Sequence, residues 1–191
     1  MKNLKIGFAM CGSFCTFDKA IEQIEELTTL GATVTPIMSQ TAYSTDTKFG
    51  KADEINKRIE KICNRSIIHT ITDAEPIGPQ KMFDILVVEP CTGNTLAKLA
   101  CGITDTAVTM ACKSHIRNAR PILLAVSTND ALGNSAKNIG QLLNFKNFYF
   151  LPMRQDNCTG KPRSVVADFS LTKSAIESAM AGKQLQPIIT A

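Results

Sequence analysis

The chain alternates short apolar runs with longer amphipathic stretches, and this alternation limits the fold more than any other feature of the sequence. Residues 4–10 form an apolar run that is short enough for a buried strand, whereas residues 16–30 carry apolar side chains at helical spacing. Gly31 follows, where a residue with positive φ often ends a helix, and residues 32–38 form the next apolar run. The pattern predicts a strand, a crossover helix and a second, parallel strand.

The same pattern continues to the end of the chain. It predicts strands at residues 84–89, 121–126 and 147–151, and helices at residues 51–63, from about residue 94, and at residues 105–118, 135–143 and 171–182. Residues 66–81 are expected to be irregular, and the polar residues 154–163 to form a surface loop. We therefore expect an α/β fold of the three-layer, Rossmann-like (flavodoxin-like) kind, with a parallel sheet and helices on both faces, in a single domain over residues 1–191.

Charge and hydropathy argue against two classes of partner. The sequence has 21 Lys and Arg against 17 Asp and Glu, a net charge of +4, and these residues are scattered. A basic run or stripe, which is typical of nucleic-acid binding, is missing. No apolar stretch reaches the length of about 20 residues that spans a bilayer, and residues 1–6 lead into a strand without a signal-peptide core. We expect a cytoplasmic protein that binds neither nucleic acid nor membranes.

Seven cysteines form an odd set without a C-x-x-C pair or a histidine at metal-ligand spacing, so we expect free thiols and no metal. Small apolar segments surround Cys91, Cys101 and Cys112, which favours core packing. Cys11 and Cys15 flank a candidate ligand loop. Packing is the main interpretation for them too, and reactivity is the alternative.

Polar segments follow three of the predicted strands, at the carboxyl edge where doubly wound sheets bind ligands. They are Gly12-Ser13-Phe14 after the first strand, Ser39 after the second, and Thr92-Gly93-Asn94-Thr95 after the third. Hydroxyl, amide and free backbone N–H groups suit a phosphate or another polar ligand. Each segment also has a structural explanation, as a turn or, for Ser39, a helix cap. Asp105 is expected to cap the helix at residues 105–118.

Residues 89–105, E-P-C-T-G-N-T-L-A-K-L-A-C-G-I-T-D, resemble the P-x-[ST]-x-N-T-x-x-K-x-A-x-G-x-x-D element of a flavoprotein superfamily. That superfamily includes flavin-containing cysteine decarboxylases and flavin prenyltransferases. The resemblance implies an FMN cofactor and a set of residues that hold it. Those residues are Gly12, Ser13, Phe14, Ser39, Thr92, Gly93, Asn94, Thr95 and Ser127.

Two departures argue against cysteine decarboxylation. The decarboxylases carry an Asn-His pair where this chain has Glu75-Pro76-Ile77, so their histidine is missing. Their P-x-M-N-x-x-M substrate clamp becomes V-S-T-N-D-A-L at residues 126–132, which keeps only Asn129. For the histidines that are present, His69 and His115, we expect structural or surface roles.

Several strings are similar to the B-subunit family of dipicolinate synthases, among them S-T-N-D-A-L-G at residues 127–133 and I-R-N-A-R-P at residues 116–121. This resemblance implies a role in sporulation, in the oxidation of dihydrodipicolinate to dipicolinate. It also implies a homo-oligomer built from trimers and a partner A subunit that binds NADP. The chain itself lacks the G-x-G-x-x-G fingerprint of nicotinamide binding.

A dicarboxylate substrate suggests arginine ligands, and the candidates by chemistry are Arg117, Arg120, Arg154 and Arg163, together with Asn129. Arg117 and Arg120 lie near a predicted helix C-terminus, where basic residues also complement the helix dipole, and Arg154 and Arg163 lie in the predicted polar loop. The sequence identifies no catalytic residue, and it leaves open whether Glu89, at a predicted strand end, is paired or exposed. Two alternatives stay open: an independent FMN-dependent lyase or prenyltransferase-like enzyme, and a structural subunit without catalysis.

Overall fold

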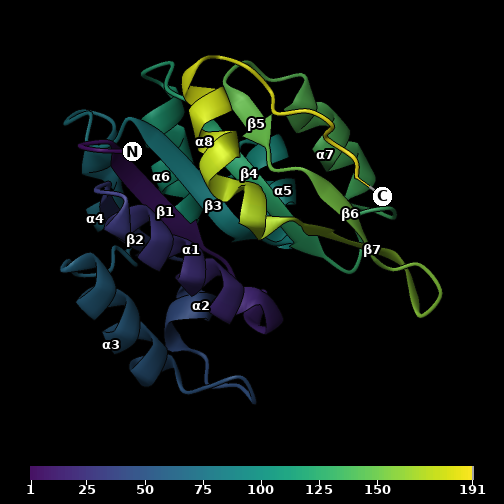
Figure 1. Ribbon diagram of the computed structural model, residues 1–191, viewed down its shortest axis with the longest axis horizontal. Helices are drawn as coiled ribbons and strands as arrows, with labels where there is room; N and C mark the ends of the chain where they lie inside the picture. Colours follow the sequence, from purple (N-terminus) through teal and green to yellow (C-terminus); the bar gives the residue numbers. More distant parts are fainter. Residues whose placement is uncertain (191) are drawn as a thin grey trace.

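The computed structural model describes residues 1–190, in which helices cover both faces of a central sheet (Figure 1). The strands are β1 (Lys5–Met10), β2 (Thr33–Met38), β3 (Ile85–Cys91), β4 (Ile122–Thr128), β5 (Phe148–Phe150), β6 (Met153–Asn157) and β7 (Lys161–Ala167). The helices are α1 (Phe17–Thr29), α2 (Gln40–Ser44), α3 (Ala52–Cys63), α4 (Ile71–Ala74), α5 (Gly93–Ala100), α6 (Ala107–Ile116), α7 (Ala136–Leu143) and α8 (Thr172–Met180), with short 3₁₀ turns η1 (Phe14–Thr16), η2 (Glu75–Ile77) and η3 (Phe169–Leu171). Figure 1 shows α1 and α8 in front of the sheet and α5 and α6 behind it, which confirms the three-layer α/β fold.

The parallel part of the sheet has the order β2-β1-β3-β4-β5. From β1 the chain first moves to β2 on one side and then crosses to β3 on the other. The point between β1 and β3 is therefore the topological switch point, and the loops that leave these strands diverge there. This arrangement creates space for a ligand at the carboxyl edge of the sheet.

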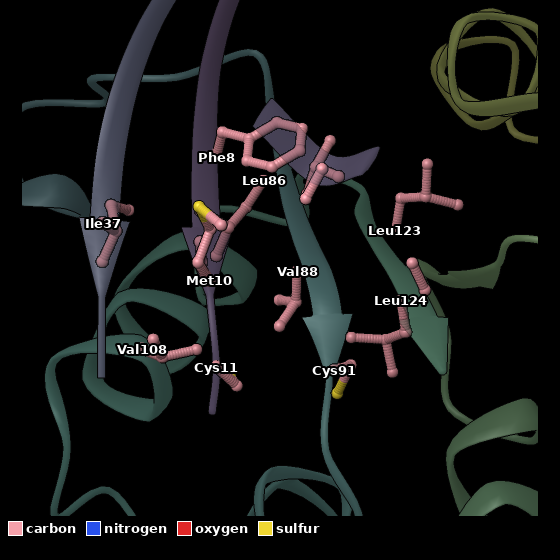
Figure 2. Packing of buried hydrophobic residues seen from close by; sticks show 14 of the residues in the cluster. Phe8, Met10, Cys11, Ile37, Leu86, Val88, Cys91, Val108, Leu123 and Leu124 are labelled. Atoms are coloured by element: carbon pink, nitrogen blue, oxygen red, sulfur yellow. The ribbon is translucent and has the colours of Figure 1, made fainter. Parts of the chain in front are cut away.

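Strand β3 shows no alternation of apolar and polar residues, and its place in the core explains why. All seven of its residues are buried, because strands lie on both sides of it and helices cover both faces. Figure 2 shows Val88 of β3 between apolar side chains of the neighbouring strands, among them Met10 of β1 and Leu124 of β4. The register between β3 and β4 shifts between Val88 and Cys91, just before the chain leaves the sheet.

Helix α1 follows its sequence pattern closely. Ala20, Ile21, Ile24 and Leu27 are buried on one face, as expected for an amphipathic helix packed on a sheet. The helix stops at Gly31, whose φ of 85° lies in the left-handed region that side chains disfavour. The predicted helix end is therefore confirmed.

The prediction of a surface loop at residues 154–163 was wrong, because this segment belongs to an antiparallel hairpin of β6 and β7. The short strand β5 pairs only with the first half of β4, from Ile122 to Leu124. Ser127 and Thr128 at the other end of β4 pair instead with Val166 and Val165 of β7. The hairpin thus completes a strand edge that would otherwise have unpaired backbone groups.

Residue 105 does not have its expected role either. Thr106 caps α6, with reciprocal hydrogen bonds between Thr106 and Thr109, and Asp105 instead accepts a hydrogen bond from Lys98 Nζ at 2.7 Å. Residues 66–81 are more regular than expected, since they include α4 and η2. Within residues 1–190, no helix combines the length and apolar character needed to cross a bilayer.

Candidate functional site

The loops after β1 and β4 meet at the carboxyl edge. Ser13 follows β1, and Ser127 lies near the end of β4. Their hydroxyl oxygens hydrogen-bond to each other at 2.8 Å across the end of β3. Two residues 114 positions apart in the sequence are thus brought together by the sheet order.

The loop after β3 is held by local hydrogen bonds. Thr92 caps α5, and its Oγ1 accepts from the Thr95 backbone N–H at 3.4 Å. The hydroxyl of Thr95 in turn donates to Cys11 Sγ at 3.1 Å, which joins this loop to the end of β1. Gly93 leaves no room for a side chain, because a Cβ there would lie 2.7 Å from Ser135 Oγ and 2.9 Å from Thr128 Oγ1. The loop is therefore preorganised by its contacts with β1 and β4.

These loops surround a cavity of about 490 Å³, which we call the edge cavity. Its size lies within the range of about 300–1,000 Å³ that is usual for small-molecule sites. The lining combines the three strand ends with the hairpin and with the segment between α2 and α3. The lining residues are Gly12, Ser13, Phe14, Cys15, Thr16, Lys48, Phe49, Thr92, Ser127, Thr128, Asn129, Asp156, Lys161, Ser164, Val165 and Val166.

The β6–β7 hairpin supplies one wall of the edge cavity. The buried Ser164 donates to Asn129 Oδ1 at 3.4 Å and lies 3.5 Å from Asp156 Oδ2, and Lys161 Nζ pairs with the same carboxylate oxygen at 3.1 Å. Lys48 is the second cation of the lining and comes from a different segment. The edge cavity therefore presents two ammonium groups against one carboxylate.

The comparisons with known proteins agree with this fold. The model of the Flavoprotein family matches residues 1–174. The chain belongs to the Flavoprotein family. It is 44% identical over 189 residues to the B subunit of dipicolinate synthase from Bacillus subtilis strain 168, an alignment that covers 99% of this chain and 94% of that protein.

Solved structures extend the comparison. The crystal structure of the dipicolinate synthase B subunit from Bacillus halodurans is 40% identical, covers 100% of this chain and 99% of its own, and superposes with a TM-score of 0.91. DmrB from Burkholderia xenovorans, a cubic protein cage for redox transfer solved in complex with FMN, has a TM-score of 0.69 at 19% identity, over 94% of this chain and 96% of that chain. At that identity the likeness to DmrB shows a shared fold.

The structure places most of the predicted flavin-binding residues of this Flavoprotein member at the carboxyl edge, although in different surroundings. Ser13, Thr92 and Ser127 line the edge cavity with Gly12 and Phe14, whereas Gly93 and Asn94 line a second cavity beside it. Thr95 is buried under the loop. Ser39 accepts a hydrogen bond from the Ala42 backbone N–H at 3.3 Å as the cap of α2, which is the structural alternative considered for it.

The predicted substrate residues are separated by the fold. Asn129 lines the edge cavity, but Arg117 and Arg120 follow the C-terminus of α6 at the opposite, amino edge of the sheet. Arg120 donates to the Phe83 carbonyl and pairs with Asp84 Oδ1 at 3.7 Å, where β3 begins. The two arginines therefore cannot contact a ligand in the edge cavity. Lys48 and Lys161 were missed because neither residue belongs to a recognisable motif.

A weak sequence pattern indicates the β6–β7 hairpin that forms this wall. Residues 157–160, N-C-T-G, form a turn with a glycine between two extended segments, a pattern that favours a hairpin. The first segment, M-R-Q-D-N, is too polar to resemble a strand. Its strand conformation depends on pairing with β7.

The thiols near the site are mostly inert. Cys11, Cys91 and Cys112 are buried, and burial raises the pKa of Cys11 to about 11 and raises the pKa of Cys91 and Cys112 well above the ordinary range. The prediction of core packing is confirmed for Cys91 and Cys112 but was wrong for Cys101, which is exposed. Cys15 is exposed and lines the edge cavity.

Glu89 is buried in β3, three residues before Thr92. Its Oε2 accepts a hydrogen bond from Thr172 Oγ1 at 2.8 Å at the start of α8, while its Oε1 has no partner among the described residues. Burial raises the pKa of Glu89 from 4.5 to about 8, and the hydrogen bond from Thr172 opposes this only in part. The carboxyl group is therefore mainly protonated at neutral pH.

Neither histidine contacts the edge cavity. His115 is buried at the amino edge, with Nε2 3.1 Å from the Pro121 carbonyl oxygen, and His69 stacks on Tyr43 with ring centroids 3.8 Å apart. The expected structural role of His115 is confirmed. Among residues 1–190, no group of three or more His, Cys, Asp or Glu side chains has the arrangement of a metal site.

Proposed function

We propose that this chain acts as the B subunit of a dipicolinate synthase, which oxidises dihydrodipicolinate to dipicolinate together with a nicotinamide-binding A subunit during sporulation. The observation that carries the proposal is the 44% identity to the B subunit of the Bacillus subtilis enzyme over 99% of the chain. In the reaction, a hydride and a proton leave the dihydropyridine ring, which becomes aromatic. Protein side chains cannot accept a hydride, so a cofactor must do so.

The edge cavity fits FMN by its size and by its donors. Ser13, Thr92 and Ser127 line the cavity from three strand ends, and their hydroxyl groups would hold the phosphate and ribityl groups. Phe14 adds an apolar ring to the same lining. A bound flavin would supply a two-electron acceptor. The structural likeness to the FMN complex of DmrB supports this assignment.

We assign the carboxylates of the substrate to Lys48 and Lys161. Both lysines line the edge cavity, and an ammonium group forms a strong, charge-assisted hydrogen bond with a carboxylate. Lys161 pairs with Asp156 in an exposed contact, with side chains 57% and 39% exposed. Such surface pairs contribute about 0–1 kcal/mol, so a substrate carboxylate can displace Asp156 at little cost.

A reconstitution experiment tests the proposed function. The purified chain is mixed with an A subunit, NADP and dihydrodipicolinate, and dipicolinate is measured by its ultraviolet absorbance. We expect more product than the A subunit forms alone, and equal product with and without the chain would contradict the proposal. The Lys48→Gln, Lys161→Gln double variant should raise KM about tenfold or more, whereas Lys137→Gln, an exposed lysine of α7 outside the cavity, should not.

Flavin binding is tested separately by titrating the chain with FMN. A flavin absorbance that stays with the protein through gel filtration supports the cofactor assignment. If FMN separates completely while the reconstituted activity persists, the flavin assignment is wrong and the oxidation depends on NADP of the A subunit alone.

We further propose that copies of the chain associate into a homo-oligomer built from trimers. An apolar groove of about 580 Å³ between α5, α6 and β5 includes Ile103 and Phe145, which are 47% and 39% exposed. The cage formed by DmrB supports an assembly of copies. Light scattering should give a multiple of the mass of 20.7 kDa, and Ile103→Glu should reduce the measured mass if this groove is the contact.

A further inference from the structure

A second cavity of about 450 Å³ adjoins the edge cavity and shares Thr92 and Thr128 with it. It lies between the start of α5, the end of β4 and the first turns of α7. Its lining consists of Thr92, Gly93, Asn94, Ala97, Thr128, Asp130, Asn134, Ser135 and Asn138. We call it the amide cavity, because three of these residues are asparagines.

Asn138 is the most informative residue of the amide cavity. It is only 5% exposed, and its side-chain amide makes no hydrogen bond to any group within residues 1–190. The amide is not sealed in the core either, because the fully covered side-chain atoms without a partner are Asn56 Oδ1 and Glu89 Oε1. The polar end of Asn138 therefore opens onto the cavity.

The position of this side chain is fixed by the packing of its helix. Gln141 Nε2, on the same helix, donates to the Ala100 carbonyl at the end of α5 at 2.8 Å. The contact ties α7 to α5 beside the cavity. A buried polar group without a partner is costly, and native proteins usually pair it with protein, water or ligand. An amide at a cavity wall that has no partner in the protein is thus available to a ligand.

The charge of the amide cavity differs from that of the edge cavity. Its lining contains no lysine, arginine or histidine, and Asp130 is its one charged residue. Asp130 Oδ1 accepts from the Asn134 backbone N–H at 3.1 Å, which orders the carboxylate. Arg163 approaches Gly133 from outside the lining. The cavity therefore disfavours a carboxylate ligand and favours a group that donates N–H bonds.

We propose that the amide cavity binds a planar amide edge, in which an N–H donor lies beside a carbonyl acceptor. The Asn138 amide offers one donor and one acceptor to such an edge, and the Asp130 carboxylate accepts a further N–H. The inference rests on the proposed function, in which the carboxamide of a nicotinamide ring is a ligand of this chemistry. The pyrimidine edge of an oxidised flavin also places an N–H beside a carbonyl and can pair with the Asn138 amide, but it has no second N–H for Asp130.

Nicotinamide and nicotinate distinguish an amide from a carboxylate on the same ring. Each is titrated into the ¹⁵N-labelled chain, and shifts of the Asn138 side-chain NH₂ and of the Thr92 and Thr128 amides report binding. We expect nicotinamide to bind at least tenfold more tightly than nicotinate. Measurable binding of both compounds with equal affinities would overturn the proposal.

Variants connect the binding to the two named side chains. Asn138→Leu should weaken nicotinamide binding at least tenfold, because it removes both hydrogen bonds that the Asn138 amide makes to the ligand. Asn144→Leu is the matched control, because Asn144 follows the same helix, bonds to the Gly140 carbonyl and lies outside this lining. If Asn138→Leu does not fold, as judged by circular dichroism, Asp130→Asn serves instead and should remove the preference for nicotinamide over nicotinate.

A third compound, lumichrome, identifies the source of the amide edge, since it carries the flavin pyrimidine edge without phosphate. Binding of lumichrome but not nicotinamide, with dependence on Asn138, assigns the cavity to a flavin, and the reverse assigns it to nicotinamide. If neither compound depends on Asn138, the proposal is overturned. The proposed function is judged independently, by whether the wild-type chain raises dipicolinate formation.

Discussion

The two ends of the sheet use similar polar residues in different ways. At the amino edge the Lys5 backbone N–H donates to Asp84 Oδ2 at 2.9 Å, Arg120 donates to the Phe83 carbonyl, and Asn118 Nδ2 donates to the Gly78 carbonyl at 2.7 Å. At the carboxyl edge the hydroxyls of Ser13 and Ser127 bond only to each other beside a cavity, and the Asn138 amide bonds to no described residue. The polar groups named at the amino edge thus bond to backbone groups of the protein, whereas the Asn138 amide at the carboxyl edge remains available and the two serines have only each other.

The comparison shows why residue type alone misplaced the substrate site. Arginine is the better carboxylate ligand, yet Arg120 already has protein partners. Lysine is the less specific carboxylate ligand, but Lys48 and Lys161 line the edge cavity and the predicted arginines do not. Lys161 also has a partner, but its pair with Asp156 is exposed and lies at a cavity, so position beside a cavity is the more useful sign of a binding site.

The largest expected effect on stability is at Glu89. Its carboxyl group is buried, has a partner for only one oxygen and lies outside both cavities. The raised pKa means that from pH 4.5 to about 8 the unfolded carboxyl ionises while the folded one stays protonated, so stability falls by about 1.4 kcal/mol per pH unit. Above pH 8 both states are ionised and the loss levels off. Glu89→Gln should remove this slope in urea unfolding, whereas Glu177→Gln on the exposed side of α8 should keep it.

At the amino edge, His115 should make the stability of the fold depend on pH in the opposite direction to Glu89. Burial lowers the pKa of His115 from 6.5 to about 4, so the unfolded chain gains a proton first as the pH falls. Stability should decrease between pH 6.5 and 4 by about 1.4 kcal/mol per unit from this residue. His115→Gln should flatten this acid limb when it is compared in the Glu89→Gln background. An unchanged acid limb would show that His115 is not held neutral.

Arg120→Ala should affect stability without affecting ligands. The substitution leaves the Phe83 and Lys81 carbonyls without this donor, and we expect a loss of about 1–3 kcal/mol in urea unfolding. FMN and dipicolinate affinities should stay within twofold of wild type. A tenfold loss of affinity would mean that the two ends of the sheet are coupled.

Ser13→Ala combined with Ser127→Ala is the converse change. The pair removes both partners of one hydrogen bond, so stability should change by less than about 1 kcal/mol. FMN affinity should fall about tenfold, measured by the same gel-filtration and titration assays. A large loss of stability with unchanged affinity would assign these serines to the fold instead of the site.

Much of the parallel sheet was predictable, because a buried strand and an amphipathic helix each require a distinct apolar period. The end of α1 at Gly31 followed from the same local rules. The hairpin was not predictable, because the polar residues of β6 become a strand only by pairing with β7. The cap of α6 was misplaced by one residue, since the neighbouring Asp105 and Thr106 both suit a helix start.

The sequence by itself determined the layer order, the family and the three segments that end at the carboxyl edge, because periodicity and motifs are local properties of the chain. Only the tertiary structure decided which polar groups line a cavity and which are taken up by the backbone. Arg120 and Lys161 carry the same charge in the sequence, but one is occupied by backbone carbonyls and the other lines a cavity. Hydrogen-bond saturation depends on neighbours that are distant in the chain, and only folding brings these neighbours together.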